Sequence, residues 1–399
     1  MNFRAVLCAL VAAAATVSAV PGPATASTVG GGIRTWTPLS EHPPPGTVSS
    51  TSAVSVAKSF DLVTALRGTF AGRVPTMHKA NPNVKVLAYT NAMFAQSGQA
   101  ATFPASYYSY DAKGQKVRTT NYGNYMMNPR SLEGGAAGAS WADERFRQCR
   151  NAALESGYDG CFLDLLGTAP LKAGYVTSPP IDPATGKQWT ETSYLAATSA
   201  LANQIRKLLS ADGHGNLLVY GNGLGNGPRF YAGSKVLLPS LDGGIAESWM
   251  RTGPSSLTLW PTETQWKQNV SMLAAGKIYA SVKTFAPGTT AQKEQWHKYS
   301  LASFLLGADS ADGFSFLGSP TSDYAVSSPW WATKLGRPSG AYTRSGAAYV
   351  RTFASGKAVV NPTTGVTSVS LGAKYCGLTG FSGNKITLGA HSGDVLRKC

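Results

Sequence analysis

Two short stretches of the sequence each carry a pair of carboxylates five residues apart. In "GYDGCFLDLLG" (157–167) Asp159 precedes an apolar run that ends near Asp164, and in "LDGGIAESW" (241–249) Asp242 stands in the same relation to Glu247. Both runs have the apolar character of a buried strand. Five residues of strand span about 16 Å. The first carboxylate of each pair is therefore predicted to lie at one end of its strand and the second at the other end.

Asp164 and Glu247 are the candidates for chemistry. Side chains alternate along a strand, so Asp164 shares a face with Phe162, and Glu247 shares one with Ile245. Two carboxylates at the same end of parallel strands suit glycosidic cleavage, in which one protonates the leaving oxygen and the other attacks or stabilises the anomeric carbon. A structural alternative is that Asp164 caps the following loop and Glu247 pairs with Arg251.

The surroundings of the two carboxylates predict different roles. Asp164 has the shorter side chain and emerges from an apolar strand, which favours a fixed, ionised nucleophile or charge stabiliser. Glu247 reaches further and has Trp249 nearby in the sequence. Burial against the indole ring would raise the pKa of Glu247, so we expect it to be the general acid.

Polar and aromatic residues near the same strand ends are predicted to bind the hydroxyls and ring faces of a substrate. The predicted substrate-binding residues are Tyr89, Asn91, Asn222, Trp249, Arg251 and Lys283. The segment 103–124 adds Tyr107, Tyr108, Tyr110 and Tyr122 on the same side. Ordinary hydrogen bonding and packing of this segment onto itself is an open alternative for each of them.

The elements that must position these residues alternate between β-rich runs and amphipathic segments. The predicted strands are 60–66, 84–90, 124–129, 160–166, 216–222, 243–249, 277–283 and 312–318. The clearest predicted helices are 141–157, 191–213, 261–276 and 291–309. Eight strands with intervening helices predict an α/β fold, a (β/α)₈ TIM barrel over residues 27–340, whose active site lies at the carboxyl ends of the strands.

Residues 341–399 have a different character. Short β runs with turn signals follow one another there, and no helical period continues. This pattern predicts a small C-terminal antiparallel β domain that packs behind the barrel.

The first 26 residues are typical of an export signal. Arg4 precedes an apolar stretch, and Ala24-Thr25-Ala26 fits the small-x-small cleavage pattern. Because no later stretch approaches the roughly 20 apolar residues of a membrane span, the mature chain is expected to be secreted without a span.

Four cysteines remain after the predicted cleavage, and an even number in an exported chain indicates two disulfides. Four cysteines allow three pairings. We favour Cys149 with Cys161 and Cys376 with Cys399, because each pair then lies within one predicted domain. The spacing of a zinc site is missing, so no metal is predicted.

The formal charge is +15, with Lys and Arg spread thinly along the chain. The nearest cluster, Arg145, Arg147 and Arg150, fits one exposed side of a helix, and a nucleic-acid partner is not expected. Solubility is the simpler explanation of the charge, although an anionic glycan is left open. We expect a monomer whose partner is a carbohydrate substrate.

Several common hydrolase and nucleotide motifs are missing from the sequence. "GNGLGNG" (221–227) lacks the Lys-Ser/Thr ending of a phosphate loop, and neither a Gly-x-Ser-x-Gly elbow nor a His-Glu-x-x-His motif occurs. These absences argue against common esterases and peptidases. No cofactor is predicted.

The motifs "VLAYTNAMF", "GYDGCFLDLLG", "YGNGLGNG", "ESWM" and "DGFSFLG" follow one another in this order. With them the chain resembles the bacterial glycoside hydrolase-like family 15 over roughly residues 55 to 335. That group is similar to barrels with α-1,4-polygalactosaminidase activity, and the resemblance implies a barrel hydrolase of glycans. An aspartate on the fourth strand with a carboxylate on the sixth also resembles α-galactosidase-type barrels, which is a likeness of fold.

The sequence therefore leaves three functions as alternatives. The first is a secreted O-glycoside hydrolase that acts on a poly- or oligosaccharide through Asp164 and Glu247. The second is a non-catalytic glycan-binding or cell-wall-associated barrel. The third is another exported hydrolase that uses the Asn and Lys residues of the cavity.

Overall fold

The computed structural model describes residues 33–39, 46–95, 103–133, 139–251, 256–317 and 328–399. The predicted signal peptide, residues 1–26, lies outside the described residues, so its cleavage site stays a prediction.

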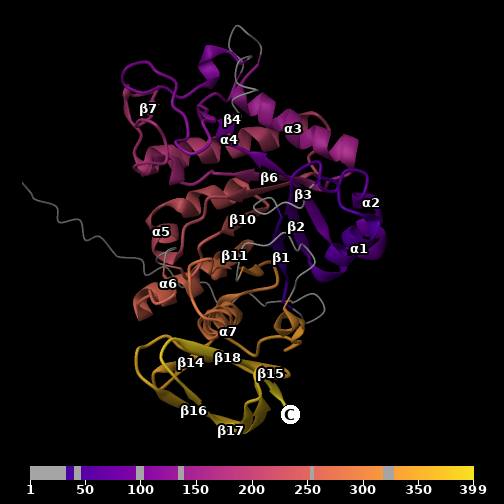
Figure 1. Ribbon diagram of the computed structural model, residues 1–399, viewed down its shortest axis with the longest axis vertical. Coiled ribbons are helices and arrows are strands. Elements are labelled where there is room, and N and C mark those ends of the chain that lie inside the picture. Colours follow the sequence, from indigo (N-terminus) through magenta and orange to yellow (C-terminus); the bar gives the residue numbers. More distant parts are fainter. Residues whose placement is uncertain (1–32, 40–45, 96–102, 134–138, 252–255, 318–327) are drawn as a thin grey trace, which may run out of the picture.

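Eight parallel strands form a nearly closed barrel (Figure 1). In sheet order, which is also chain order, they are β1 (Trp36–Pro38), β2 (Leu62–Ala65), β3 (Lys85–Asn91), β6 (Gly160–Asp164), β9 (Leu218–Asn222), β10 (Gly243–Ala246), β11 (Ile278–Lys283) and β12 (Gly313–Leu317). The backbone N–H of Phe314 donates to the carbonyl of Arg34 over 2.9 Å, which brings the last strand beside the first.

Helices connect successive strands of the barrel (Figure 1). They are α1 (Ser50–Ser59), α2 (Val74–Ala80), α3 (Trp141–Ser156), α4 (Glu191–Ala211), α5 (Gly227–Ala232), α6 (Glu263–Met272) and α7 (Thr290–Gly307). The four helices predicted from the sequence are present as α3, α4, α6 and α7. Each of these begins with a capping box, for example Ser140 with Asp143 in α3, which explains why their starts were visible in the sequence.

Alternate side chains of the strands fill the barrel interior. The interior cluster consists of Trp36, Leu62, Leu87, Phe162, Tyr220, Ile245 and Tyr279. Phe162 and Ile245 are the residues that were expected to share a face with the two candidate carboxylates. The alternation in β6 and β10 therefore points both carboxylates toward the mouth of the barrel.

One predicted strand was wrong. Residues 124–129 do not enter the barrel: β5 (Tyr125–Met126) pairs with β4 (Phe94–Ala95) in a separate two-stranded antiparallel sheet. The missing barrel strand is β1, which pairs in parallel with β2. It spans only three residues and ends at Pro38, too short for a period of two to be visible. Because the two errors cancel, β6 and β10 are still the fourth and sixth strands of the barrel.

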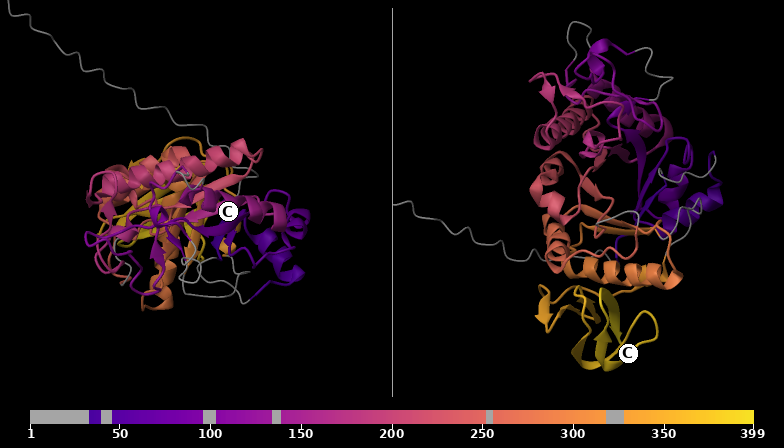
Figure 2. Two further views of the ribbon diagram at one scale, coloured as in Figure 1. Left: turned by 90° about the horizontal axis from the view of Figure 1, so that it is seen from above. Right: turned by 60° about the vertical axis from the view of Figure 1, so that its left-hand side comes forward.

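Beyond the barrel lies a six-stranded antiparallel sheet. In chain order its strands are β13 (Thr343–Ser345), β14 (Ala348–Phe353), β15 (Gly356–Asn361), β16 (Thr367–Cys376), β17 (Ser382–Leu388) and β18 (Ser392–Lys398). Helix α7 lies between the barrel and this sheet, and contacts β14, β15 and β18 (Figure 2). The C-terminal sheet thus covers a helix of the barrel on the side of its last strands.

Both predicted disulfides are confirmed. Cys149 of α3 is bonded to Cys161 of β6, with Cα atoms 5.2 Å apart, and Cys376 of β16 is bonded to Cys399, with Cα atoms 5.4 Å apart. The first bond ties a covering helix to the strand that carries Asp164. None of the helices in the described part of the chain is long and apolar enough to cross a membrane.

Asp159 and Asp242, the first carboxylates of the two sequence pairs, lie at the amino-terminal rim of the barrel together with Asp312. Asp159 accepts the backbone N–H of Val86 over 2.8 Å, and Asp242 accepts that of Val219 over 2.9 Å. Asp312, which is buried, accepts that of Ile278 over 2.8 Å. Each of these aspartates precedes one strand and holds the backbone of the preceding strand of the barrel. They have a structural role, as their place at this rim predicts.

Candidate active site

The candidate active site lies at the carboxyl ends of the barrel strands. Asp164 is the last residue of β6, and Glu247 follows directly after the end of β10. Asn222, the last residue of β9, stands between them: its Nδ2 donates to Asp164 Oδ1 over 3.0 Å and to Glu247 Oε2 over 3.1 Å. Since both hydrogen bonds leave one nitrogen, the two carboxylate oxygens lie no more than about 6 Å apart.

Asp164 is held by three hydrogen-bond donors. Besides Asn222, the hydroxyl of Tyr89 donates to Oδ2 over 2.8 Å and the backbone N–H of Leu165 donates to Oδ1 over 2.8 Å. Leu165 has a φ of 65°, an unusual left-handed conformation for this residue type, as often found beside functional groups. Burial, and then the negative charge of Glu247, raise the pKa of Asp164 above its usual value, although the three donors oppose this.

Asn91 and Tyr89 form a chain of donors behind Asp164. The Asn91 Nδ2 lies 3.4 Å from the Tyr89 hydroxyl, and its Oδ1 accepts the backbone N–H groups of Met93 and Phe94. Burial and the nearby charge of Asp164 raise the pKa of Tyr89, so its phenol stays protonated and can donate. Tyr89 therefore contacts the candidate carboxylate itself, and Asn91 lies behind Tyr89.

Glu247 forms an ion pair with Lys283, the last residue of β11. About a third of the Glu247 side chain is exposed (34%). The sequence had suggested Arg251 as a structural partner for Glu247. In the structure the Arg251 guanidinium lies over the ring of Trp296, 4.7 Å from its centroid, and donates to the Ser256 carbonyl.

The structure places the Trp249 side chain in the core, whereas the sequence had predicted it to bind substrate. Its side chain is buried, its indole N–H donates to the carbonyl of Asn269 over 2.9 Å, and its ring meets the edge of Phe304. The alternation failed here because β10 ends at Ala246, so a period of two no longer applies at residue 249. The Glu247 side chain is about a third exposed (34%), which differs from the burial that was expected of it.

The tyrosines of segment 103–124 divide between packing and exposure. Tyr107 and Tyr108 are buried in the core, so the packing alternative holds for these two. Tyr110 donates to the carbonyl of Ala105 within the same segment. Tyr122 is 78% exposed.

Tyr175 was missed by the sequence reasoning. Burial, followed by the charges of Asp164 and Glu247, raises the pKa of Tyr175 to about 12, which places its hydroxyl within the field of both carboxylates. It belongs to the loop that follows β6. Loops after barrel strands form the active-site face, so a search of that loop for aromatic residues could have found it.

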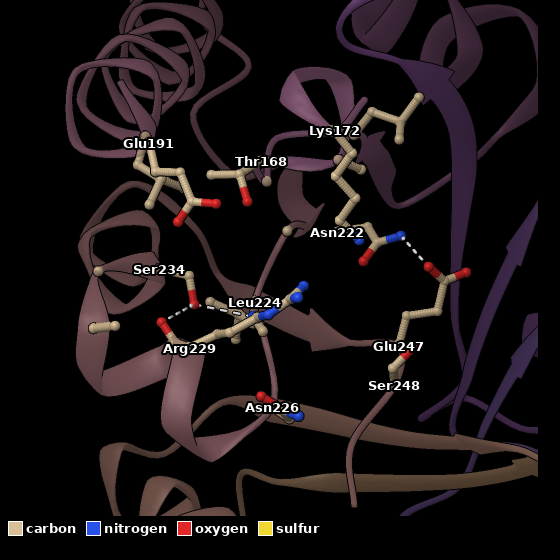
Figure 3. A pocket seen from close by; sticks show the side chains of 18 of the residues that line it. Thr168, Lys172, Glu191, Asn222, Leu224, Asn226, Arg229, Ser234, Glu247 and Ser248 are labelled. Atoms are coloured by element: carbon tan, nitrogen blue, oxygen red, sulfur yellow. Dashed lines mark hydrogen bonds between the residues drawn. The ribbon is translucent and has the colours of Figure 1, made fainter. Parts of the chain in front are cut away.

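A cavity of about 460 Å³ opens beside Glu247 (Figure 3). Glu247 and Asn222 line it on one side, and the opposite wall includes Thr168 and Glu191 (Figure 3). Lys283 also belongs to the lining. This volume is within the range of small-molecule sites. Among the described residues, no group of three or more His, Cys, Asp or Glu side chains could hold a metal ion.

One further prediction from the sequence was wrong. Arg145 does not lie on an exposed helix side: its side chain is 3% exposed, donates to the carbonyl of Asn91 over 2.8 Å and stacks over Trp141. This buried arginine supports the end of β3, next to Tyr89.

The sequence profile of hypothetical glycosyl hydrolase family 15 matches residues 78–357, which is more than half of the chain. The chain belongs to this family. No curated protein matches the sequence of this family 15 chain. The family supports glycan hydrolysis in general, as the resemblance of its motifs implied.

Two glycoside hydrolases are among the solved structures that the chain resembles in fold. A family 31 dextranase from Flavobacterium johnsoniae has a TM-score of 0.50 and 10% identity, and the match covers 94% of this chain and 52% of the dextranase. The chain thus spans about half the length of that enzyme. A family 30 subfamily 8 xylanase from Clostridium acetobutylicum has a TM-score of 0.45 and 12% identity, over 94% of this chain and 97% of the xylanase. At such identities the likeness concerns the fold alone.

Proposed function

We propose that this family 15 chain is a secreted O-glycoside hydrolase that cleaves a poly- or oligosaccharide with Asp164 and Glu247. One observation carries the proposal: the amide of Asn222 donates to both carboxylates at the carboxyl ends of the barrel strands. Carboxylates on a barrel's amino-terminal rim serve its backbone, whereas this pair lies at the opposite rim, where Glu247 lines a cavity. The two disulfides are consistent with export.

Asp164 acts as the nucleophile in this proposal. Every donor around it, from Tyr89, Leu165 and Asn222, favours an ionised carboxylate that accepts hydrogen bonds. These bonds also fix its position, as attack on an anomeric carbon requires. Its Oδ2 accepts one of the three bonds and its Oδ1 accepts two, so Oδ2 is the oxygen better able to form a new bond.

Glu247 acts as the general acid and base. It lines the cavity and is more exposed than a core residue, so it can reach a leaving-group oxygen. The pair cannot easily hold two negative charges, because the charge of Glu247 raises the pKa of Asp164. Lys283 stabilises the ionised form of Glu247 that arises once its proton has been given to the leaving group.

The spacing favours retention of anomeric configuration. Retaining enzymes hold their carboxyl groups about 5–5.5 Å apart, whereas inverting enzymes need about 6.5–9.5 Å for a water molecule. The bridge through Asn222 limits the distance between Asp164 Oδ1 and Glu247 Oε2 to about 6 Å. In the first step the bond from Asp164 to the anomeric carbon forms, the glycosidic bond breaks and Glu247 protonates the leaving oxygen. In the second step Glu247 takes a proton from water, which displaces Asp164.

The test compares Asp164→Asn and Glu247→Gln on a glycan panel and on activated aryl glycosides. We expect Asp164→Asn to lose activity on all substrates. Glu247→Gln should lose more on natural linkages than on aryl glycosides, because a good leaving group needs little protonation. Asp242→Asn is the matched control, since Asp242 opens the same motif at the opposite rim, and it should retain activity.

Three outcomes would contradict parts of this proposal. Hydrolysis that survives both substitutions would remove the pair from the mechanism. If Glu247→Gln loses equally on both substrate types while Asp164→Asn spares the aryl glycosides, the two roles are reversed. A first-formed product of opposite anomeric configuration, seen by NMR, would exclude retention.

A further inference from the structure

The cavity beside Glu247 contains two cationic side chains that the proposed chemistry does not use. Lys172 comes from the loop after β6, and Arg229 comes from α5. In Figure 3 both side chains extend into the cavity, from different elements, between the wall that carries Glu191 and the wall that carries Glu247. They belong to separate parts of the chain, so only the folded barrel brings them together.

No described acidic side chain is paired with either cation. Within the described residues, neither Lys172 nor Arg229 forms an ion pair, whereas Lys283 in the same cavity is paired with Glu247. The described lining contains four basic side chains, namely Lys172, Arg229, Arg251 and Lys283, against two acidic ones, Glu191 and Glu247. Two like charges that converge in a concave space repel each other, and a bound anion relieves that repulsion.

The position of Glu247 in the cavity shows on which side of the scissile bond an anion bound by Lys172 and Arg229 would lie. Glu247 lines this cavity and donates its proton to the leaving oxygen in the proposed function, on which this step rests. The sugar on the leaving-group side of the scissile bond therefore lies in the same cavity as Lys172 and Arg229.

We propose that the leaving-group side binds a uronic acid residue, whose carboxylate is held by Lys172 and Arg229. An arginine fork can hold both oxygens of a carboxylate, and a lysine adds a point charge. Thr168 and Glu191, on the facing wall, are in place for the hydroxyls of the same sugar (Figure 3). The formal net charge of +15 would attract a polyanionic glycan over a longer range.

Binding is tested in the Asp164→Asn background, so that hydrolysis does not consume the ligand. The probes are oligogalacturonate, hyaluronan and alginate tetrasaccharides, each beside its carboxyl-reduced counterpart, which has the same backbone without the charge. Isothermal titration calorimetry in low salt should show at least one uronate probe that binds about tenfold or more tightly than its reduced form. A sulfated carrageenan tetrasaccharide, which carries sulfate instead of carboxylate, is titrated separately.

Lys172→Gln and Arg229→Gln should each reduce the preference for that uronate over its reduced form by about tenfold. Lys207→Gln is the matched control: it removes one charge from an exposed position on α4, outside the cavity, and should leave the preference unchanged. Thermal unfolding of each variant checks that the fold is retained.

Three results would overturn the inference: equal binding of every charged and reduced pair, an effect of the two cavity variants no larger than that of Lys207→Gln, or a response of the sulfated probe alone. Because binding is measured without turnover, these results are distinct from a failure of the proposed function. That failure would appear as hydrolysis that survives loss of both carboxylates.

Discussion

Replacing Asp164 by Asn should make the protein more stable at neutral pH while removing its activity. The carboxylate is buried beside Glu247, and both effects raise its pKa above the usual value. A raised pKa means that folding disfavours the ionised form. The sign follows from linkage: the folded state binds the proton more tightly than the unfolded state, so stability is lost as pH rises from the unfolded-state pKa through the folded-state pKa.

The magnitude depends on which hydrogen bonds an asparagine keeps. Its Oδ1 can still accept from Leu165 and Asn222, whose donors lie 2.8 and 3.0 Å from the present oxygen. Its amide would face the Tyr89 hydroxyl, which can accept instead of donate, at a cost of about 1 kcal/mol. Loss of the buried charge and of its repulsion by Glu247 acts in the opposite direction. We expect a net gain on the order of 1 kcal/mol, or roughly 2 °C in melting temperature.

The assay is thermal unfolding of the wild type and of Asp164→Asn across a series from acidic to neutral pH. The stability advantage of the variant should grow with pH and vanish where Asp164 is protonated in both states. Asp242→Asn carries the same substitution to the opposite rim, where Asp242 is ion-paired with Arg206, and it should lower stability. A variant at position 164 that is less stable by the same amount at every pH would show that the hydrogen bonds outweigh the charge.

Two further substitutions test the division between the rims. Asp242→Ala should lower the free energy of unfolding by about 1–3 kcal/mol, because it leaves the backbone N–H of Val219 without its acceptor. Its kcat should be unchanged. Chemical denaturation measures the first effect and steady-state kinetics the second. Tyr89→Phe removes a donor that lowers the pKa of Asp164. The acidic limb of its kcat/KM profile should therefore move to higher pH, and kcat should fall about tenfold or more; an unshifted limb would place Tyr89 outside the mechanism.

The sequence predicted the strand faces well, because alternation is a local property of an extended chain. Asp164, Asn222 and Tyr89 meet at the mouth of the barrel because each stands two residues beyond an interior side chain of its own strand. Trp249 shows the limit of this logic, since an early strand end turned its ring into the core. A sequence pattern carries weak information about where a strand ends.

Contacts between residues far apart in the chain were harder to predict from the sequence. The ion pair between Glu247 and Lys283 depends on the register of β10 against β11, which no local pattern reveals. Arg145 was predicted to lie on an exposed helix side, but its guanidinium donates to the carbonyl of Asn91 instead of contacting solvent. The strand Trp36–Pro38 has only three residues, so its pairing within the barrel defines it and no pattern in its own sequence does.

Strand register explains why one amide reaches both carboxylates. β6 pairs Leu163 with Gly221 of β9, so the next residues, Asp164 and Asn222, stand side by side. β10 pairs Ile245 with Asn222, so Glu247 rises two residues further on the same face. Asn222 therefore lies level with one carboxylate and one side-chain step below the other, within reach of both. A one-residue shift of β9 would turn its side chain outward, so the separation of the two carboxylates depends on the register of the strand between them.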